Sequence, residues 1–424
     1  MTDLNYADIS IAKTHKLEKL NQILGLAVQA PFYKKLYEGI DLPLKSLEDL
    51  KRLPIIDKQS LCSEGQTCSQ TLFTRTTGGF YTFSTGGTSG RMTFARYGLD
   101  EFNEVCEGTA YGLEASGIRP GDLVANCIRA GAFWTGFLIT FRALEKIQCN
   151  ILPITDNQPV EKTLEYLKMM RPNTIFGISP TLVQIAQEAY RRSIDLDIEK
   201  VSFASTPLTA EQKEYLSSIW PRASFHSAGY GAAEVGPIGF QCKFCQGTEH
   251  HILQPYSIVE SDEAGGIIAT SLIRTLQPAV RMRVGDNIQW IDEPCPCGRT
   301  APRFKLLQRS DEILEFSHDS ISLEQIGSCL KEFRQLAPVF QVRLELNGKE
   351  TDIILRVEAS DCEAVDDYEL SSKVYRCMSN KIEAIGSNRE KNSIRVFKIL
   401  IVPPGGIPRI ETTGKIRRVI DKRF

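Results

Sequence analysis

The sequence predicts an α/β protein: a large N-terminal domain of helix-covered, mainly parallel sheets with a strand-rich subdomain, followed by a small C-terminal α+β domain. Strand-like and helix-like segments alternate from about residue 100 to 230, strand-like alternation dominates residues 265–308, and a new helix–strand pattern starts near residue 309. Alternating strands and helices are typical of a parallel sheet covered by helices. We therefore expect two domains, residues 1–308 and 309–424.

Length and composition limit the classes of function. The chain has 424 residues, of which 42% are apolar and 24% charged, and its formal net charge is −2. This charge gives no reason to expect nucleic acid or an anionic membrane as a partner. No apolar run approaches the roughly 20 residues of a membrane span, and the polar N-terminal segment is not a signal peptide. Twelve cysteines without an export signal favour reduced thiols in the cytoplasm.

The first predicted element is an amphipathic helix over residues 11–29, where apolar side chains recur at helical spacing between Leu17 and Ala27. Shorter helical pieces follow over residues 45–61, interrupted by Pro54. In the alternating part we expect strands at 122–128, 148–153, 173–178, 200–205 and 223–229, with helices at 132–146, 159–170, 180–193 and 210–220.

From residue 265 onwards the predicted strands and helices no longer alternate one by one. We expect strands at 265–273 and 279–291, then strands at 311–316, 339–346, 351–359 and 393–402, with helices at 322–335 and 367–386. Ligands of parallel sheets bind where strands end and loops begin.

The stretch "FSTGGTSGRM" (83–92) is rich in glycine and hydroxyl side chains. Such loops suit phosphate, because backbone N–H groups approach closely and hydroxyls donate hydrogen bonds. It is not a Walker loop, which needs Lys followed by Ser or Thr and then a helix. The following "TFARYG" alternates like a strand, so we expect a hairpin. On these residues alone, a phosphate loop and an ordinary Ser/Gly turn are equally compatible.

The loop resembles the phosphate loop of the adenylate-forming superfamily, Ser-Ser-Gly-Thr-Thr-Gly-Lys-Pro, with Arg91 and Met92 in place of the last two residues. Four further motifs of that family follow in order: "GYGAAEVGP" (229–237), "RVGD" (283–286), "QRSDEI" (308–313, with Gln308 in place of Gly) and "IETTGKIRRV" (410–419). The segments "APFYKKLYEGI" (30–40) and "CPCGRTAPRF" (295–304) resemble the phenylacetate–CoA ligase group. The resemblance covers essentially the whole chain, and five ordered motifs argue against coincidence.

The resemblance implies an activity. A carboxylate attacks the α-phosphorus of ATP, pyrophosphate leaves, and the resulting acyl-adenylate passes its acyl group to CoA. Charge must be neutralised at the transferring phosphoryl group while the reactants are held in line. It also implies that residues 1–308 form the AMP-binding domain and that 309–424 form a mobile domain carrying a catalytic lysine.

The family motifs assign nucleotide-binding roles. Tyr230 and Gly231 lie at the position of adenine and the adenylate, and Asp286 would accept hydrogen bonds from both ribose hydroxyls. Arg309 would support the same sugar. The residues that would cradle the β- and γ-phosphates are Thr85, Gly86, Gly87, Thr88, Ser89 and Gly90.

Three residues would act on the reaction or on domain movement. Glu234 would bind Mg²⁺, a hard cation held by a carboxylate and phosphate oxygens. Lys415 would bridge the substrate carboxylate and the phosphate, and Asp311 would be the hinge between the half-reactions. Taken singly, Lys415 could be solvated surface, Asp286 a turn residue and Glu234 a helix start. Together, in family order, they favour the enzyme.

The pair Phe133-Trp134 lies at the expected start of the 132–146 helix, where the family builds its acyl pocket. A flat aromatic acid would stack well there. Packing of both rings in the protein core is equally compatible with the sequence.

Two cysteine pairs, "CKFC" (242–245) and "CPC" (295–297), have metal-type spacing and could close one tetrahedral zinc site. We favour a structural zinc ion on Cys242, Cys245, Cys295 and Cys297, with His251 as the substitute for one of the first pair. A closed site of four ligands has no catalytic role. Reduced thiols without metal are the alternative.

Two residues depart from the family pattern, and the first of them concerns the transfer of the acyl group to CoA. His318 stands where CoA ligases have a glycine beside the pantetheine tunnel, and an imidazole there would crowd the tunnel. Thr206 replaces a common acidic residue. CoA as acceptor therefore competes with an acyl carrier protein or an amine.

Two other classes are weaker. One is a zinc-stabilised scaffold on an inactive ligase fold, against which the intact Lys415, Glu234 and Asp286 argue. The other is nucleic-acid binding through a zinc ribbon, although neither cysteine pair lies in a basic stretch interleaved with aromatics. The sequence leaves a homodimer open and does not identify the acid.

Overall fold

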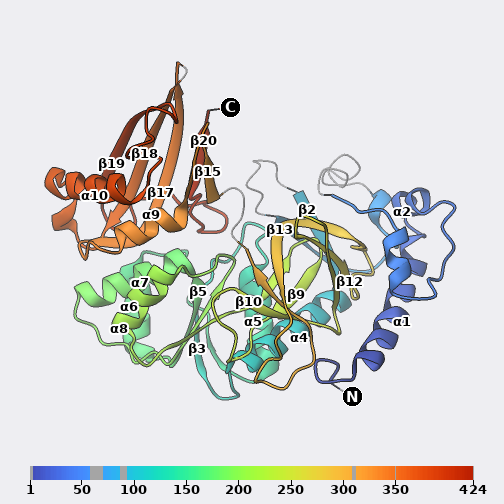
Figure 1. Ribbon diagram of the computed structural model, residues 1–424. Coiled ribbons are helices and arrows are strands. Elements are labelled where there is room, and N and C mark those ends of the chain that lie inside the picture. The colour runs from blue at the N-terminus through green and yellow to red at the C-terminus, as the bar shows by residue number, and fades with distance from the viewer. Residues whose placement is uncertain (1–2, 58–69, 86–92, 308–311, 349, 424) are drawn as a thin grey trace. The chain divides into compact units, whose positions relative to one another are not determined.

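The computed structural model describes residues 3–57, 70–85, 93–307, 312–348 and 350–423. The chain divides into two compact units, each made of two segments (Figure 1): residues 1–153 with 226–307, and residues 154–225 with 308–424. The expected α/β class is confirmed, because parallel strand pairs covered by helices occur together with a larger antiparallel sheet. The expected domain boundary at residues 308 and 309 stays a prediction.

One long helix of the first unit has recognisable caps at both ends. In α4 (Leu99–Ser116) the Glu101 carboxylate accepts a hydrogen bond from the backbone N–H of Gly98 at 3.1 Å, and Gly117 ends the helix with φ of 116°. An N–H at a helix start has no partner within the helix, so such a side chain stabilises it. The other helices are α1 (Ile9–Ala27), α2 (Pro31–Leu36) and α5 (Gly136–Ile147), with short 3₁₀ turns η1 (Glu48–Arg52) and η2 (Gln70–Leu72).

A seven-stranded sheet, entirely antiparallel in its recorded pairings, forms the strand-rich part of this unit, in the order β11-β12-β13-β14-β10-β9-β8. The sheet starts at residue 230, earlier than the expected 265–308. Its first strands were missed because they are short and contain glycine and histidine. The strands are β8 (Tyr230–Ala232), β9 (Gly236–Phe240), β10 (Glu249–Ile252), β11 (Ser257–Ser261), β12 (Gly266–Ser271), β13 (Met282–Ile291) and β14 (Arg303–Leu306).

Two smaller strand pairs complete the first unit. Strands β1 (Phe80–Thr85) and β2 (Thr93–Gly98) form the expected antiparallel hairpin, with Phe80 opposite Gly98. Strands β3 (Leu123–Asn126) and β4 (Asn150–Leu152) run parallel.

The second unit begins with a β–α alternation. Strands β5 (Thr174–Ile178) and β6 (Lys200–Ala204) are parallel, and β5 is buried along its whole length, as expected for a strand covered on both faces. The helices are α6 (Val160–Met170), α7 (Ser179–Arg191) and α8 (Ala210–Ile219), and β7 (Ser224–Ser227) lies where the chain leaves this unit.

The C-terminal part of this unit is the expected α+β arrangement. Its sheet has the order β19-β18-β17-β20, and Figure 1 shows α9 and α10 with these strands. Apolar side chains of the two helices share one core with the sheet. Helix α9 is shorter than the expected 322–335, because the backbone turns at Phe333 to enter β17. The elements are β15 (Ile313–Glu315), β16 (Ser320–Ser322), α9 (Leu323–Leu330), β17 (Leu336–Asn347), β18 (Glu350–Ala359), η4 (Cys362–Ala364), α10 (Tyr368–Lys381), β19 (Ile394–Val402) and β20 (Val419–Lys422), the last of which was not expected.

Candidate functional site

The hairpin of β8 and β9 carries three of the predicted site residues. Tyr230 and Gly231 lie in β8, and Glu234 lies in the turn that the Val235 N–H closes on the Ala232 carbonyl at 3.0 Å. Both carboxylate oxygens of Glu234 are shielded from solvent. A carboxylate supplies the hard oxygen donors that Mg²⁺ prefers, so the chemistry of this residue fits a magnesium ligand.

Asp286 is brought to the same hairpin by an irregularity in β13. The pairing of β12 and β13 shifts register there, and Gly285 has φ of 88°, a conformation that glycine adopts without strain. The Tyr230 hydroxyl donates a hydrogen bond to Asp286 Oδ2 at 2.8 Å. Two motifs that lie 56 residues apart in sequence therefore form one polar site.

Buried rings support the Tyr230 side chain from behind. Its ring lies 6.1 Å from His250 and 5.9 Å from Phe304, and these two rings stack on each other at 5.7 Å. Burial lowers the pKa of His250 to about 4, so the imidazole packs as a neutral ring. The tyrosine is thus held by apolar packing, which fixes the direction of its hydroxyl.

Gly231 allows the two strands of this hairpin to approach closely. A Cβ atom at residue 231 would lie 2.5 Å from the Gly236 carbonyl oxygen. That distance is far inside van der Waals contact, and backbone cannot move aside as a flexible side chain can.

We expect the substitution Gly231→Ala to destabilise the protein by about 1–3 kcal/mol, the usual cost of overpacking, and to weaken ATP binding by displacing Tyr230 and Glu234. Urea unfolding and calorimetric titration with ATP measure the two effects. Gly25→Ala is the matched control, since a Cβ at residue 25 in α1 meets nothing within 4 Å. Unchanged stability and ATP affinity in Gly231→Ala would contradict the role given to this close approach.

The predicted phosphate loop lies between β1 and β2. Residues 86–92, which include Gly86, Gly87, Thr88, Ser89 and Gly90, lie outside the described residues, while Thr85 ends β1. The end of β1 that leads into this loop is held in place, because the Ser84 N–H donates to the Phe133 carbonyl at 2.9 Å.

The aromatic pair Phe133-Trp134 is not at the start of a helix, so that part of the prediction is wrong. Helix α5 begins at Gly136, and Ala132 and Phe133 have φ of 49° and 60°. The two glycines around the pair favour a loop here. Phe133 is 56% exposed and meets the Phe94 ring edge-on at 5.6 Å. Its role in an acyl pocket stays a prediction.

In the second unit, Lys415 lies on a tight turn. The Ile410 N–H donates to the Lys415 carbonyl at 2.8 Å, and the Gly414 N–H donates to the Ile410 carbonyl at 2.7 Å. Gly414 has φ of 70°, and Arg409 pairs with Ile416 in an isolated antiparallel bridge. The backbone beneath the lysine is therefore well defined.

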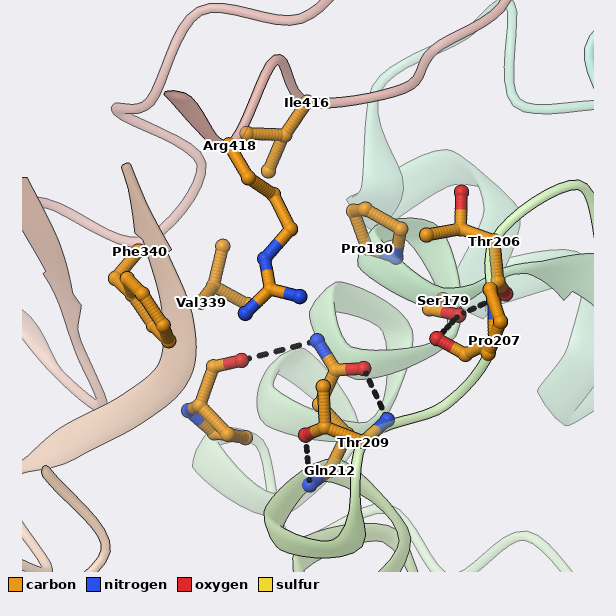
Figure 2. Close-up of a pocket in the computed structure, with 11 residues that line it drawn as sticks. Ser179, Pro180, Thr206, Pro207, Thr209, Gln212, Val339, Phe340, Ile416 and Arg418 are labelled. Carbon is orange, nitrogen blue, oxygen red and sulfur yellow. Dashed lines mark hydrogen bonds between the residues drawn. The ribbon is translucent and has the colours of Figure 1, made fainter. Parts of the chain in front are cut away.

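Arg418 is a neighbouring residue to which the sequence reasoning gave no role. Its guanidinium donates to Glu312 Oε1 at 3.0 Å and lies 5.0 Å from the Phe340 ring. Arg418 lines a small cavity of about 30 Å³. In Figure 2 its guanidinium points towards Gln212. The Gly-Lys-x-x-Arg spacing of residues 414–418 was the sequence signal that could have pointed to Arg418. The other side chains drawn around the cavity include Ser179, Pro180, Thr206, Pro207, Thr209, Val339 and Ile416.

Two predicted residues of this unit lie outside the described residues. They are Arg309 and the predicted hinge Asp311, just before Glu312.

The cysteine clusters come together as expected, with one change in membership. One donor atom each of Cys242, His251, Cys295 and Cys297 lies within 4.8 Å of the others. Cys245 is outside this group, although its sulfur lies 3.7 Å from that of Cys242. Of the two ligand sets that the sequence left open, the geometry therefore favours the one that contains His251.

The donor geometry fits a zinc ion. The sulfurs of Cys242 and Cys295 are 3.6 Å apart, and Cys297 Sγ lies 3.5 Å from His251 Nε2. Two thiolates bound tetrahedrally at about 2.3 Å from zinc would be about 3.8 Å apart. His251 Nδ1 lies 3.3 Å from the Ala301 carbonyl, so a proton there leaves Nε2 to face the thiols.

The segment around His318 is a short turn between β15 and β16. The N–H groups of His318 and Asp319 both donate to Asn392 Oδ1, at 3.0 and 3.1 Å. The Asp319 carboxylate accepts hydrogen bonds from Asn388 and Asn392, which lower its pKa. His318 itself is exposed at the tip of this braced turn.

Comparison with known proteins gives consistent results. A model of the AMP-binding enzyme C-terminal domain matches residues 324–423. A phenylacetate–coenzyme A ligase of Thermus thermophilus is 26% identical, over 96% of this chain and 95% of that protein. An indoleacetate–lysine synthetase of Pseudomonas savastanoi is 25% identical, over 77% of this chain and 81% of that protein.

A solved structure of a 2-hydroxyisobutyryl-CoA ligase, in the postadenylation state with R3-HIB-AMP, has a similar fold. Its TM-score is 0.82 at 21% identity, and the match covers 99% of this chain and 91% of that one. Within the described residues, no helix combines the length and the apolar character needed to cross a membrane.

Proposed function

We propose that this chain, which belongs to the adenylate-forming superfamily, activates a carboxylic acid with ATP and releases pyrophosphate. The observation that carries the proposal is the hydrogen bond between Tyr230 and Asp286, on the same β8–β9 hairpin whose turn carries Glu234. It would place the residue proposed for adenine beside the residue proposed for the ribose, on the hairpin that carries the residue proposed for magnesium. The cell compartment we infer is the cytoplasm, consistent with twelve cysteines and the predicted reduced thiols.

The nucleotide would be bound from several sides. Tyr230 and Gly231 would lie against the adenine, while Asp286 would accept hydrogen bonds from the ribose hydroxyls. Residues 85–90 would donate backbone N–H and hydroxyl groups to the β- and γ-phosphates. Glu234 would hold Mg²⁺, which neutralises phosphate charge when bound.

The chemical step would be an in-line attack of the acid's carboxylate oxygen on the α-phosphorus. One new O–P bond forms, the bond to pyrophosphate breaks, and its electron pair leaves with pyrophosphate. Lys415 would lie between carboxylate and phosphate, where negative charge develops. Movement of residues 309–424 about Asp311 would then separate the two half-reactions.

The substrate we infer is an aromatic acid, and the acceptor is CoA. The name of the Thermus thermophilus relative supports both. A carrier protein or an amine is the second candidate acceptor, for which His318 and the indoleacetate–lysine synthetase relative are the specific observations. The presence of Lys415, Glu234 and Asp286 at the motif positions supports an active enzyme over an inactive scaffold.

Zinc would have a structural role. The set Cys242, His251, Cys295 and Cys297 supplies four ligands and leaves no open position for a substrate. It would tie β9 and β10 to the segment between β13 and β14.

The test is ATP–pyrophosphate exchange with a panel of aryl, amino and short aliphatic acids, with and without CoA. We expect exchange with aromatic acids, and a thioester when CoA is added. Exchange without thioester moves the acceptor to a carrier protein or an amine. No exchange with any acid, in a protein that binds ATP, would overturn the proposed function.

A further inference from the structure

Arg274 is a fully buried arginine that donates hydrogen bonds to backbone carbonyls of the Glu234 turn and of β2. It follows β12, and its side chain has a relative exposure of 0%. Nη1 donates to the Glu234 carbonyl at 2.8 Å and to the Ala233 carbonyl at 3.4 Å, while Nη2 donates to the Arg96 carbonyl at 2.6 Å. One planar group thus joins β2 to the turn of the β8–β9 hairpin.

Glu101 supplies the opposite charge. Its Oε2 lies 3.5 Å from Arg274 Nε, and the Glu101 side chain is only 1% exposed. The same carboxylate accepts hydrogen bonds from the N–H groups of Gly98, Thr275 and Leu276 and from the Thr275 hydroxyl. A buried ion pair persists when its remaining hydrogen-bonding positions are filled. Glu101 therefore fixes Arg274 in one orientation.

Tyr97 holds the same turn from β2. Its hydroxyl donates to the Ala233 carbonyl at 2.5 Å, and its ring lies 3.6 Å beneath the Arg274 guanidinium. Burial raises the pKa of this hydroxyl, with Arg274 opposing the shift, so it acts as a donor and not as a phenolate. Two donors, Tyr97 in β2 and Arg274 after β12, thus fix the peptide groups on either side of Glu234.

We propose that Arg274 and Tyr97 are positioning residues for magnesium: they hold the Ala233–Glu234 backbone so that the Glu234 carboxylate is oriented before ATP arrives. The proposal rests on the magnesium-binding role given to Glu234 above. Neither residue needs to touch the ion, since both act on main-chain carbonyls. Groups that hydrogen-bond to a metal ligand commonly orient that ligand, and their loss lowers metal affinity about 10–100-fold.

A purely structural role for the same cluster is the competing explanation. It would lower stability without a selective effect on magnesium. The chain offers matched controls for this distinction. The Tyr33 hydroxyl is buried and donates to the Pro278 carbonyl. Arg281 is buried, pairs with Glu260 at 3.0 Å, and donates to the Lys51 and Leu53 carbonyls.

The experiment measures the Kd of ATP by calorimetry in magnesium and in EDTA, with thermal unfolding of each variant. The ratio of the two Kd values gives the gain in ATP affinity that depends on magnesium, called the gain below. We expect Arg274→Lys to lower this gain about tenfold, and Tyr97→Phe, which removes one neutral hydrogen bond, to lower it about threefold. Tyr33→Phe and Arg281→Lys should keep the wild-type gain while losing comparable thermal stability.

The proposal is overturned if folded Tyr97→Phe keeps the wild-type gain. It is also overturned if Tyr33→Phe and Arg281→Lys lose as much of the gain as Tyr97→Phe and Arg274→Lys do. If Arg274→Lys does not fold, Tyr97→Phe decides alone. A wild-type protein whose ATP affinity does not depend on magnesium also overturns it, even where exchange supports adenylate formation. Conversely, a gain that Tyr97→Phe reduces supports positioning even if no acid gives exchange, so the two proposals fail separately.

Discussion

Replacement of Lys415 by alanine is expected to lower the rate of acyl-adenylate formation by about 10²–10³-fold, the usual effect of removing one preorganised donor at developing negative charge. The turn that carries it is closed by backbone hydrogen bonds at Ile410 and Gly414, so the substitution should leave the fold intact. The Kd of ATP should change little, because in the proposed mechanism the lysine would act where carboxylate and phosphate meet. Acid-dependent pyrophosphate release under single-turnover conditions measures the rate.

Lys422→Ala is the control, because Lys422 is an exposed lysine in β20, a few residues away. It should retain wild-type rates. If Lys415→Ala kept more than about a tenth of the rate, the lysine would not be a principal stabiliser of the transition state.

Loss of zinc is expected to have the second largest effect. The purified protein should contain one equivalent of zinc by mass spectrometry of the metal. Cys297→Ser should remove it and lower the free energy of unfolding by more than about 4 kcal/mol, as loss of a structural metal often does. The cause is that metal binding joins three segments at once, whereas the unfolded chain has no preformed site.

Cys245→Ser is the control that also decides the ligand set. Because Cys245 lies outside the four-atom group, this variant should keep its zinc and most of its stability. His251→Asn should lose both. The opposite outcome, zinc lost from Cys245→Ser and kept by His251→Asn, would restore the four-cysteine site that the sequence first favoured.

The parallel strands, the hairpin around residues 86–92 and the C-terminal α+β part were predictable, because each shows a clear apolar period. Strands β8, β9 and β10 were not. They are three to five residues long and contain glycine and histidine, and only their pairing partners reveal them.

The candidate site was predictable only as separate motifs. The hydrogen bond between Tyr230 and Asp286 depends on a register shift at Gly285, which no local pattern records. Arg274 could not be assigned at all. A single arginine in an apolar strand region acquires a role only when the fold places Glu101 and the Glu234 turn on either side of it.

The most direct test of the central claim follows an oxygen atom. The protein is incubated with ATP, an acceptor and a turned-over acid labelled with ¹⁸O in its carboxylate, and AMP is analysed by mass spectrometry. Attack of the carboxylate on the α-phosphorus predicts AMP that carries one ¹⁸O atom, with unlabelled pyrophosphate. Unlabelled AMP, or formation of ADP with labelled phosphate, would contradict an acyl-adenylate intermediate.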